Sequence, residues 1–117
     1  MSADRGDAGR AAEALAAEFL ESRGLRILER NFRCRGGEVD LIARERDTLV
    51  FVEVRLRAGR AFGGAAASVD ARKQAKVLRA AQFYLSGKPE QPCRCDVVAL
   101  DRLAAERIEW IRDAFSA

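Results

Sequence analysis

The sequence predicts an α/β fold, and three observations support this prediction. Two segments carry apolar residues at helical spacing, and several shorter segments are rich in β-branched and aromatic residues, as strands are. The chain has 117 residues, enough for one domain with a real core but not for two. We therefore expect a single domain over residues 1–117, with a frayed tail at residues 1–6.

The N-terminal third is predicted to hold a helix and then a strand. Apolar residues recur at helical spacing from about Asp7 to Arg23, and Gly24 follows as a C-terminal cap. Residues 25–30 then have the composition of a strand, and residues 31–37 read as a polar loop.

The strongest strand signals come next, at residues 38–43 and 49–55. A short polar turn centred on Arg46-Asp47 joins them, so the two segments predict a hairpin over residues 38–57.

Residues 58–67 are rich in glycine and alanine and form a candidate mobile flap beside the hairpin. A second helix is predicted from Ser68 as N-cap, with Asp70 in its first turn, to about Ser86. The helical wheel places one set of residues on a core face, namely Gln74, Val77, Leu78, Ala81 and Leu85. The opposite face is basic with one aromatic residue, and it holds Arg72, Lys76, Arg79 and Phe83.

The C-terminal part predicts a strand over residues 94–100 and then a strand or short helix over residues 107–115. The three cysteines, Cys34, Cys93 and Cys95, are an odd number with a spacing poorly suited to a structural zinc site. We expect Cys95 to fill a strand position.

Asp40 and Glu53 are carboxylates inside two segments of strand composition. An ionised carboxylate in a buried strand has to be paired, hydrogen-bonded or metal-bound, because isolating it there costs several kcal/mol or more. With the turn centred on Arg46-Asp47, Asp40 lies directly opposite Glu53. Opposed residues have Cβ atoms about 4.5 to 5.5 Å apart, which allows both carboxylates to hold one divalent ion.

The alternation of side chains along a strand predicts which residues share a face with this pair. One face holds positions 38, 40 and 42 of the first strand and positions 51, 53, 55 and 57 of the second. Arg55 then points the same way as Glu53, and the opposite, core-facing side holds Val50, Val52, Val54 and Leu56. The alternative interpretation of the carboxylates is a structural ion pair of Asp40 or Glu53 with Arg55.

Composition narrows the chemistry that such a site can perform. The chain contains no histidine, which removes Ser-His and Cys-His nucleophiles, His-ligated zinc and nucleases with a histidine base. No apolar run is long enough for a membrane span, and a signal-peptide core is lacking, so we expect a cytoplasmic protein.

Positive charge is concentrated directly after the second carboxylate. The formal net charge is +3, yet residues 53–79 alone hold seven cationic and two anionic residues. The cations are Arg55, Arg57, Arg60, Arg72, Lys73, Lys76 and Arg79. A basic field beside a carboxylate site is expected where a polyanion approaches, and a merely solvated face is the alternative.

Several ordered motifs resemble one protein family. They are Gly9-Arg10-x-x-Glu13-x-x-Ala16, Asn31-Phe32-Arg33, Gly37-Glu38-Val39-Asp40-Leu41-Ile42-Ala43, Phe51-Val52-Glu53-Val54-Arg55, Phe62-Gly63, Lys73 and Cys93-Arg94-Cys95-Asp96-Val97-Val98. Together they resemble the YraN family, a small bacterial family that is similar to archaeal Holliday-junction resolvases and belongs to the restriction-endonuclease-like superfamily.

This resemblance implies an αβββαβ core with a mixed central sheet flanked by helices, and a PD-(D/E)xK site. Asp40 matches the first acid, without the preceding proline, and Glu53 matches the second. Arg55 occupies the position of the lysine, and its planar, permanently charged guanidinium differs from an ammonium in geometry. Lys73 or Lys76 is an alternative source of the ammonium. Glu13, which lies at the border of the apolar stripe of its helix, matches the helix-borne glutamate of resolvase-like members.

We therefore expect a divalent-metal-dependent endonuclease acting on DNA, with branched or damaged DNA as candidate substrates. Mg²⁺ or Mn²⁺ would be held by Asp40, Glu53 and the Val54 carbonyl, with Arg55 at the scissile phosphate. The backbone contacts are assigned to Arg33, Arg35, Arg57, Arg60, Arg72, Lys73, Lys76 and Arg79. The alternative is a nucleic-acid-binding module that keeps the fold and lacks efficient cleavage. DNA is favoured over RNA, and a homodimer is one open arrangement.

Overall fold

The computed structural model describes residues 3–57, 69–101 and 107–116. Its elements are α1 (Ala3–Ser22), β1 (Arg26–Cys34), β2 (Gly37–Glu45), β3 (Thr48–Arg57), α2 (Ala71–Leu85), β4 (Cys93–Asp101) and β5 (Ile108–Phe115). The strands form one sheet in the order β1-β2-β3-β4-β5, in which β3 and β4 are parallel and the other neighbours antiparallel. The predicted α/β class with a mixed sheet is confirmed.

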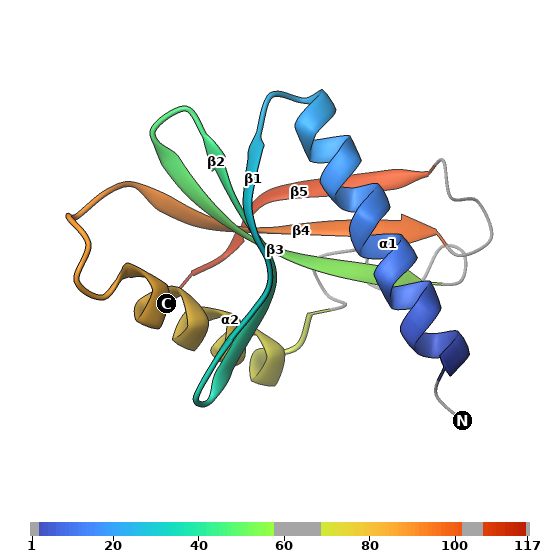
Figure 1. The fold of residues 1–117 in the computed structure, drawn as a ribbon, viewed down its shortest axis with the longest axis horizontal. Helices are drawn as coiled ribbons and strands as arrows, with labels where there is room; N and C mark the ends of the chain where they lie inside the picture. The colour runs from blue at the N-terminus through green and yellow to red at the C-terminus, as the bar shows by residue number, and fades with distance from the viewer. Residues whose placement is uncertain (1–2, 58–68, 102–106, 117) are drawn as a thin grey trace.

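The two helices pack on different sides of the sheet, which buries β3 on both faces. Ala16 and Leu20 of α1 share a core cluster with Val52, whereas Val77 of α2 shares another with Phe51. Figure 1 shows α1 crossing in front of the sheet and α2 lying beside the far end of the β1–β2 hairpin. A charged side chain on β3 is therefore held in a buried environment.

Helix α1 begins at Ala3, earlier than the predicted start near Asp7, and ends at Ser22, one residue before the predicted end at Arg23, with Gly24 following as the predicted cap. Gly24 has a φ of 95°, a conformation that suits glycine. Its amide donates to the Glu21 carbonyl at 3.1 Å, and the Leu25 amide donates to the Leu20 carbonyl at 3.0 Å. These two bonds form a Schellman motif, and Leu20 and Leu25 join the same core cluster beneath it.

The predicted polar loop over residues 31–37 is wrong, because β1 continues to Cys34 and pairs with β2 as far as Gly37. The tip of this hairpin lies against α2. A Cβ added at Gly37 would meet the main-chain nitrogen of Ala80 at 2.7 Å and the carbonyl oxygen of Lys76 at 2.9 Å. Glycine therefore permits the close approach of hairpin and helix, a tertiary contact that gives no polar or apolar signal in the sequence.

The start of α2 also differs from the prediction. Asp70 is the N-cap, and its carboxylate accepts a hydrogen bond from the Lys73 amide at 2.9 Å. Ser68, the predicted N-cap, and the predicted flap at residues 58–67 lie outside the described residues. Residues 108–115, predicted as a strand or short helix, form strand β5.

Neither helix of the described residues, α1 or α2, is both long enough and apolar enough to span a membrane.

Candidate carboxylate site

The register of β2 with β3 is the one predicted from the turn. Leu41 pairs with Val52 and Ile42 with Phe51, so Asp40 and Glu53 come next at the point where the paired residues end. At this point, side-chain carboxylates accept hydrogen bonds from the main chain of the opposing strand. Glu53 Oε1 accepts a hydrogen bond from the Asp40 amide at 3.3 Å, and Asp40 Oδ2 accepts one from the Val54 amide at 2.8 Å.

Along β2, side chains stop alternating between the two faces of the sheet at Asp40. The prediction that positions 38, 40 and 42 share one face is therefore wrong. Val39 and Ile42 both pack in the cluster that contains α2, whereas Leu41 packs in the cluster that contains α1. On β1 the residue between those paired with Val39 and Leu41 is Asn31, whose φ is 53°. This local irregularity places Asp40 within electrostatic reach of both helices.

Burial makes the ionised form of both carboxyl groups costly. Glu53 is 2 % exposed, and burial together with the charge of Asp40 raises its pKa to about 7, against the opposing effect of Lys73. Burial also raises the pKa of Asp40, while the hydrogen bond from the Val54 amide and the charge of Lys73 act in the opposite direction. Two adjacent carboxyls of this kind favour the uptake of a proton or of a cation.

Lys73 is the cation that the fold brings to this pair. Its Nζ lies 3.5 Å from Glu53 Oε2, and the lysine side chain is 37 % exposed. The predicted alternative was an ion pair of Asp40 or Glu53 with Arg55. This alternative is wrong, because in the described part of the chain the ion pair of Glu53 is formed with Lys73. Arg55 is half-buried on β3, and its buried Nε has no hydrogen-bond partner. Lys76, the other lysine considered for the ammonium, is exposed.

Glu13 approaches the pair from α1. It is half-buried, and burial together with the charge of Asp40 raises its pKa, opposed by a hydrogen bond with Asn31 and by Arg33 and Arg10. Across residues 3–57, 69–101 and 107–116, however, no three His, Cys, Asp or Glu side chains converge in a metal-binding cluster. Within the described residues, Asp40 and Glu53 are therefore two neighbouring carboxyl groups without a third in the same cluster.

The residues predicted to contact nucleic acid lie on the β1–β2 hairpin, on α2 and in the part of the chain that the structure does not describe. Arg33 and Arg35 are exposed at the end of the β1–β2 hairpin, and Arg79 Nε donates to the Arg35 carbonyl at 3.4 Å. Arg72, Lys76 and Arg79 are exposed on α2. Arg60 and the side chain of Arg57 lie outside the described residues.

Sequence reasoning assigned no role to Asp96, which is completely buried on β4. Its carboxylate accepts hydrogen bonds from Arg94 Nε at 3.0 Å, Trp110 Nε1 at 2.9 Å and the Asp113 amide at 2.9 Å. The bonds from Trp110 and Asp113 connect β4 to β5 where their register shifts, and Asp113 has a φ of 50° there. The signal available in the sequence was a single aspartate within an apolar strand. In the structure, the Asp96 carboxylate fixes the edge strand β5 to β4.

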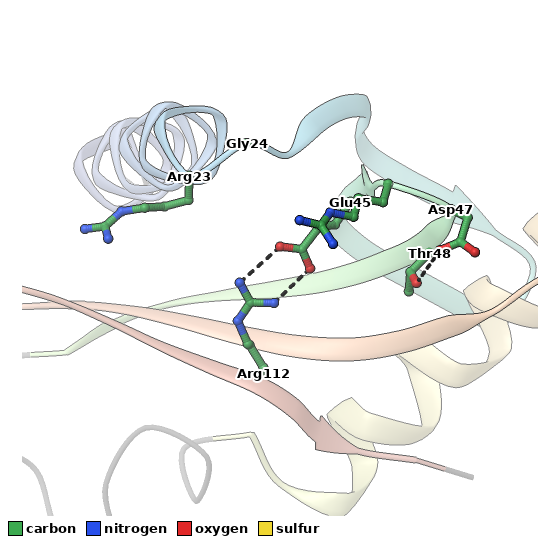
Figure 2. A pocket seen from close by; sticks show the side chains of 7 residues that line it. Arg23, Gly24, Glu45, Asp47, Thr48 and Arg112 are labelled. Carbon is green, nitrogen blue, oxygen red and sulfur yellow. Dashed lines mark hydrogen bonds and ion pairs between the residues drawn. The ribbon is translucent and has the colours of Figure 1, made fainter.

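A separate polar pocket of about 500 Å³ lies at the turn end of the β2–β3 hairpin, near the C-terminal end of α1. Figure 2 shows Arg112 forming two bonds to Glu45, at 2.8 and 3.0 Å. Hydrogen bonding to Arg112, supported by Arg94, lowers the pKa of Glu45 to about 2. The pocket shares no lining residue with the Asp40 and Glu53 pair.

The mixed sheet, its two flanking helices and the carboxylate pair of half-buried Asp40 and buried Glu53 define a class, the α/β proteins whose core is compatible with that of nucleases. Within this class, the family model of the Uncharacterised protein family UPF0102, the YraN family, matches residues 12–100, and the chain belongs to that family. The matched range contains the residues from Glu13 to Asp96 described above.

Individual relatives match over nearly the whole chain. A UPF0102 protein of Dechloromonas aromatica is 56 % identical over 109 residues, which cover 93 % of this chain and 88 % of the relative. One from Nitrosomonas europaea is 52 % identical over 111 residues, 94 % of each chain. A third, from Cupriavidus metallidurans, is 57 % identical over 109 residues, 92 % of this chain and 79 % of the relative.

Proposed function

We propose that this protein is a divalent-metal-dependent endonuclease acting on DNA. The observation that carries the proposal is the approach of Asp40 to Glu53, a half-buried and a buried carboxyl group on adjacent strands whose pKa values are both raised. Such an arrangement favours the uptake of a proton or of a cation, and perturbed pairs of this kind occur at functional sites.

The donor atoms fit Mg²⁺ or Mn²⁺. These ions prefer oxygen ligands, and Mg²⁺ is commonly held by one or two carboxylates that are completed by water and substrate phosphates. Asp40 and Glu53 supply the carboxylates, and the Val54 carbonyl is the proposed third protein ligand. A bound ion would lower the pKa of its water and offset negative charge on the phosphate.

Three further residues have roles in the proposal. Lys73, whose ammonium contacts Glu53, would take the part of the motif lysine by offsetting charge at the scissile phosphate. Arg55 would contact the same phosphate through its guanidinium, since its buried Nε is without a partner. Glu13 would orient groups bound at Asp40 from the side of α1.

Positive charge around the pair supports a nucleic-acid substrate. Arg72, Lys76 and Arg79 on α2, Arg33 on β1 and Arg35 in the turn after it are exposed, and basic side chains in such an arrangement neutralise backbone phosphates. These contacts would position DNA without reading its sequence.

The proposal is tested with labelled branched, single-stranded and duplex DNA, incubated with Mg²⁺ or Mn²⁺ or with a chelator. Wild-type protein should cleave at least one substrate in a metal-dependent manner. Asp40→Asn and Glu53→Gln should lower cleavage by on the order of a hundredfold or more, because each removes a charged metal ligand. Asp47→Asn is the matched control, since Asp47 is an exposed carboxylate at the far end of the same hairpin.

Cleavage that survives both Asp40→Asn and Glu53→Gln would contradict the proposed site. Binding without cleavage would favour the second candidate, a nucleic-acid-binding module with the nuclease fold. That candidate draws its support from Arg55 at the lysine position and from the absence of a third carboxylate ligand among the described residues.

A further inference from the structure

The exposed face of α2 carries a row of cations that ends in an aromatic residue. Arg72, Lys76, Arg79 and Phe83 are all exposed and follow one another at intervals of three or four residues, so they lie on one side of the helix. At about 1.5 Å per residue the row is about 17 Å long. Helix α2 contains no acidic residue, so the positive charge of this row is not offset within the helix.

The two ends of the row differ in chemistry. Its first residue, Arg72, is next to Lys73, which contacts Glu53 of the carboxylate pair. Its last residue, Phe83, is 57 % exposed and lies beside Phe32 of β1, with ring centroids 6.3 Å apart and planes at 45°. The row therefore leads from the proposed active site to an aromatic surface.

The β1–β2 hairpin borders the row. Its tip is held against α2 by the close approach at Gly37 and by the bond from Arg79 Nε to the Arg35 carbonyl. Arg33 and Arg35 add two exposed cations on this side. The arrangement combines a cationic track with an accessible ring, which are the two components of a surface for single-stranded nucleic acid.

We propose that α2 binds an unpaired DNA strand, whose backbone follows Arg72, Lys76 and Arg79 and one of whose bases stacks on Phe83. The cations are about one helical turn apart, a spacing comparable with that of successive phosphates in an extended strand. A base in an intact duplex is already stacked on both sides, so the Phe83 ring is complementary to an unpaired one. This inference rests on the proposed function and specifies the substrate as DNA with unpaired nucleotides next to the cleavage site.

The experiment measures the binding of a fluorescein-labelled oligothymidylate and of a labelled duplex by anisotropy, in chelator so that no cleavage occurs. Phe83→Ala should weaken binding of the single strand by on the order of tenfold, the effect of losing one stacked base, and leave duplex affinity unchanged. Leu15→Ala is the matched control, because Leu15 is an exposed apolar residue of α1 that is 39 % accessible. It should leave both affinities unchanged.

A second variant gives a direct signal of stacking. Phe83→Trp should retain the single-strand affinity, and its added fluorescence should be quenched by the oligothymidylate but not by the duplex. Single-strand binding that is unchanged in Phe83→Ala, or a loss that is equal for single strand and duplex, would overturn the inference. Because binding is measured without metal, this result is independent of whether the protein cleaves DNA.

Discussion

Asp40 and Glu53 are each anchored to the main chain of the opposing strand. Glu53 Oε1 accepts from the Asp40 amide at 3.3 Å, and Asp40 Oδ2 accepts from the Val54 amide at 2.8 Å. The hairpin therefore holds both carboxyl groups in one orientation without needing a bound ion. Such preorganisation is useful for a site that binds a cation and a substrate phosphate together.

The raised pKa of Glu53 predicts a specific pH dependence of stability. A carboxyl group whose folded pKa, here about 7, exceeds its unfolded value stabilises the fold fully below the unfolded pKa, and this contribution is lost as pH rises through the folded pKa. The melting temperature of the metal-free wild type should fall between about pH 5 and pH 8, and that of Glu53→Gln should fall less. Equal slopes for the two proteins by calorimetry would contradict the assignment. Glu45, with a pKa of about 2, titrates below this window.

Mn²⁺ should stabilise the wild type through the carboxylate pair. At an ion concentration about a hundred times the dissociation constant, binding adds about 2.7 kcal/mol to the free energy of unfolding, or several degrees in melting temperature. Asp40→Asn should lose most of this shift, because the amide retains an acceptor for the Val54 amide but carries no charge. Titration calorimetry should agree. Asp47→Asn should respond to Mn²⁺ like the wild type, and a full response of Asp40→Asn would locate the ion elsewhere.

Lys73 and Lys76 offer a matched comparison on one helix. Lys73→Gln should lower metal-dependent cleavage by about 10- to 100-fold and shift the acidic limb of its pH profile upward, because the Lys73 charge holds the pKa of Glu53 down. Lys76→Gln should weaken DNA binding modestly and make its salt dependence shallower by about one unit, without moving the pH profile. Identical pH profiles for Lys73→Gln and wild type would remove Lys73 from the site.

Arg55→Lys tests the residue at the position of the motif lysine. The buried Nε of Arg55 has no hydrogen-bond partner, so its removal should not cost stability through a lost bond. The shorter ammonium should instead increase Mg²⁺- or Mn²⁺-dependent cleavage of branched or single-strand-containing DNA. Cleavage assays and thermal melting are compared for the same protein. A lower melting temperature without any gain in cleavage would favour the binding-module candidate.

Gly37 should not tolerate a side chain. A Cβ there would lie 2.7 Å from the Ala80 main-chain nitrogen, so Gly37→Ala should lower the free energy of unfolding by about 1 to 3 kcal/mol. Gly9→Ala is the control, because no atom lies within 4 Å of its added Cβ and alanine favours a helix. Chemical denaturation measures both variants. Equal stability of Gly37→Ala and wild type would show that hairpin and helix separate at no cost.

Much of the hairpin could be predicted from the sequence because its organisation is local. The polar turn at Arg46-Asp47 and the apolar segments on either side were sufficient for the register that sets Asp40 opposite Glu53. The interruption of alternation at Asp40 was not predicted. It depends on pairing with β1, where Asn31 adopts a positive φ, and a contact between two separate segments leaves no periodic signal.

By itself, the sequence determined the α/β class, the opposition of Asp40 and Glu53 and the basic face of α2, since turns, strand composition and helical spacing act over a few residues. Only the tertiary structure decided that Lys73, rather than Arg55, contacts Glu53, and that Asp96 binds Trp110. The physical reason is that these contacts depend on how α2 and β5 pack against the sheet. That packing is set by the shapes of buried surfaces such as Gly37 against Ala80, which join residues far apart in the chain.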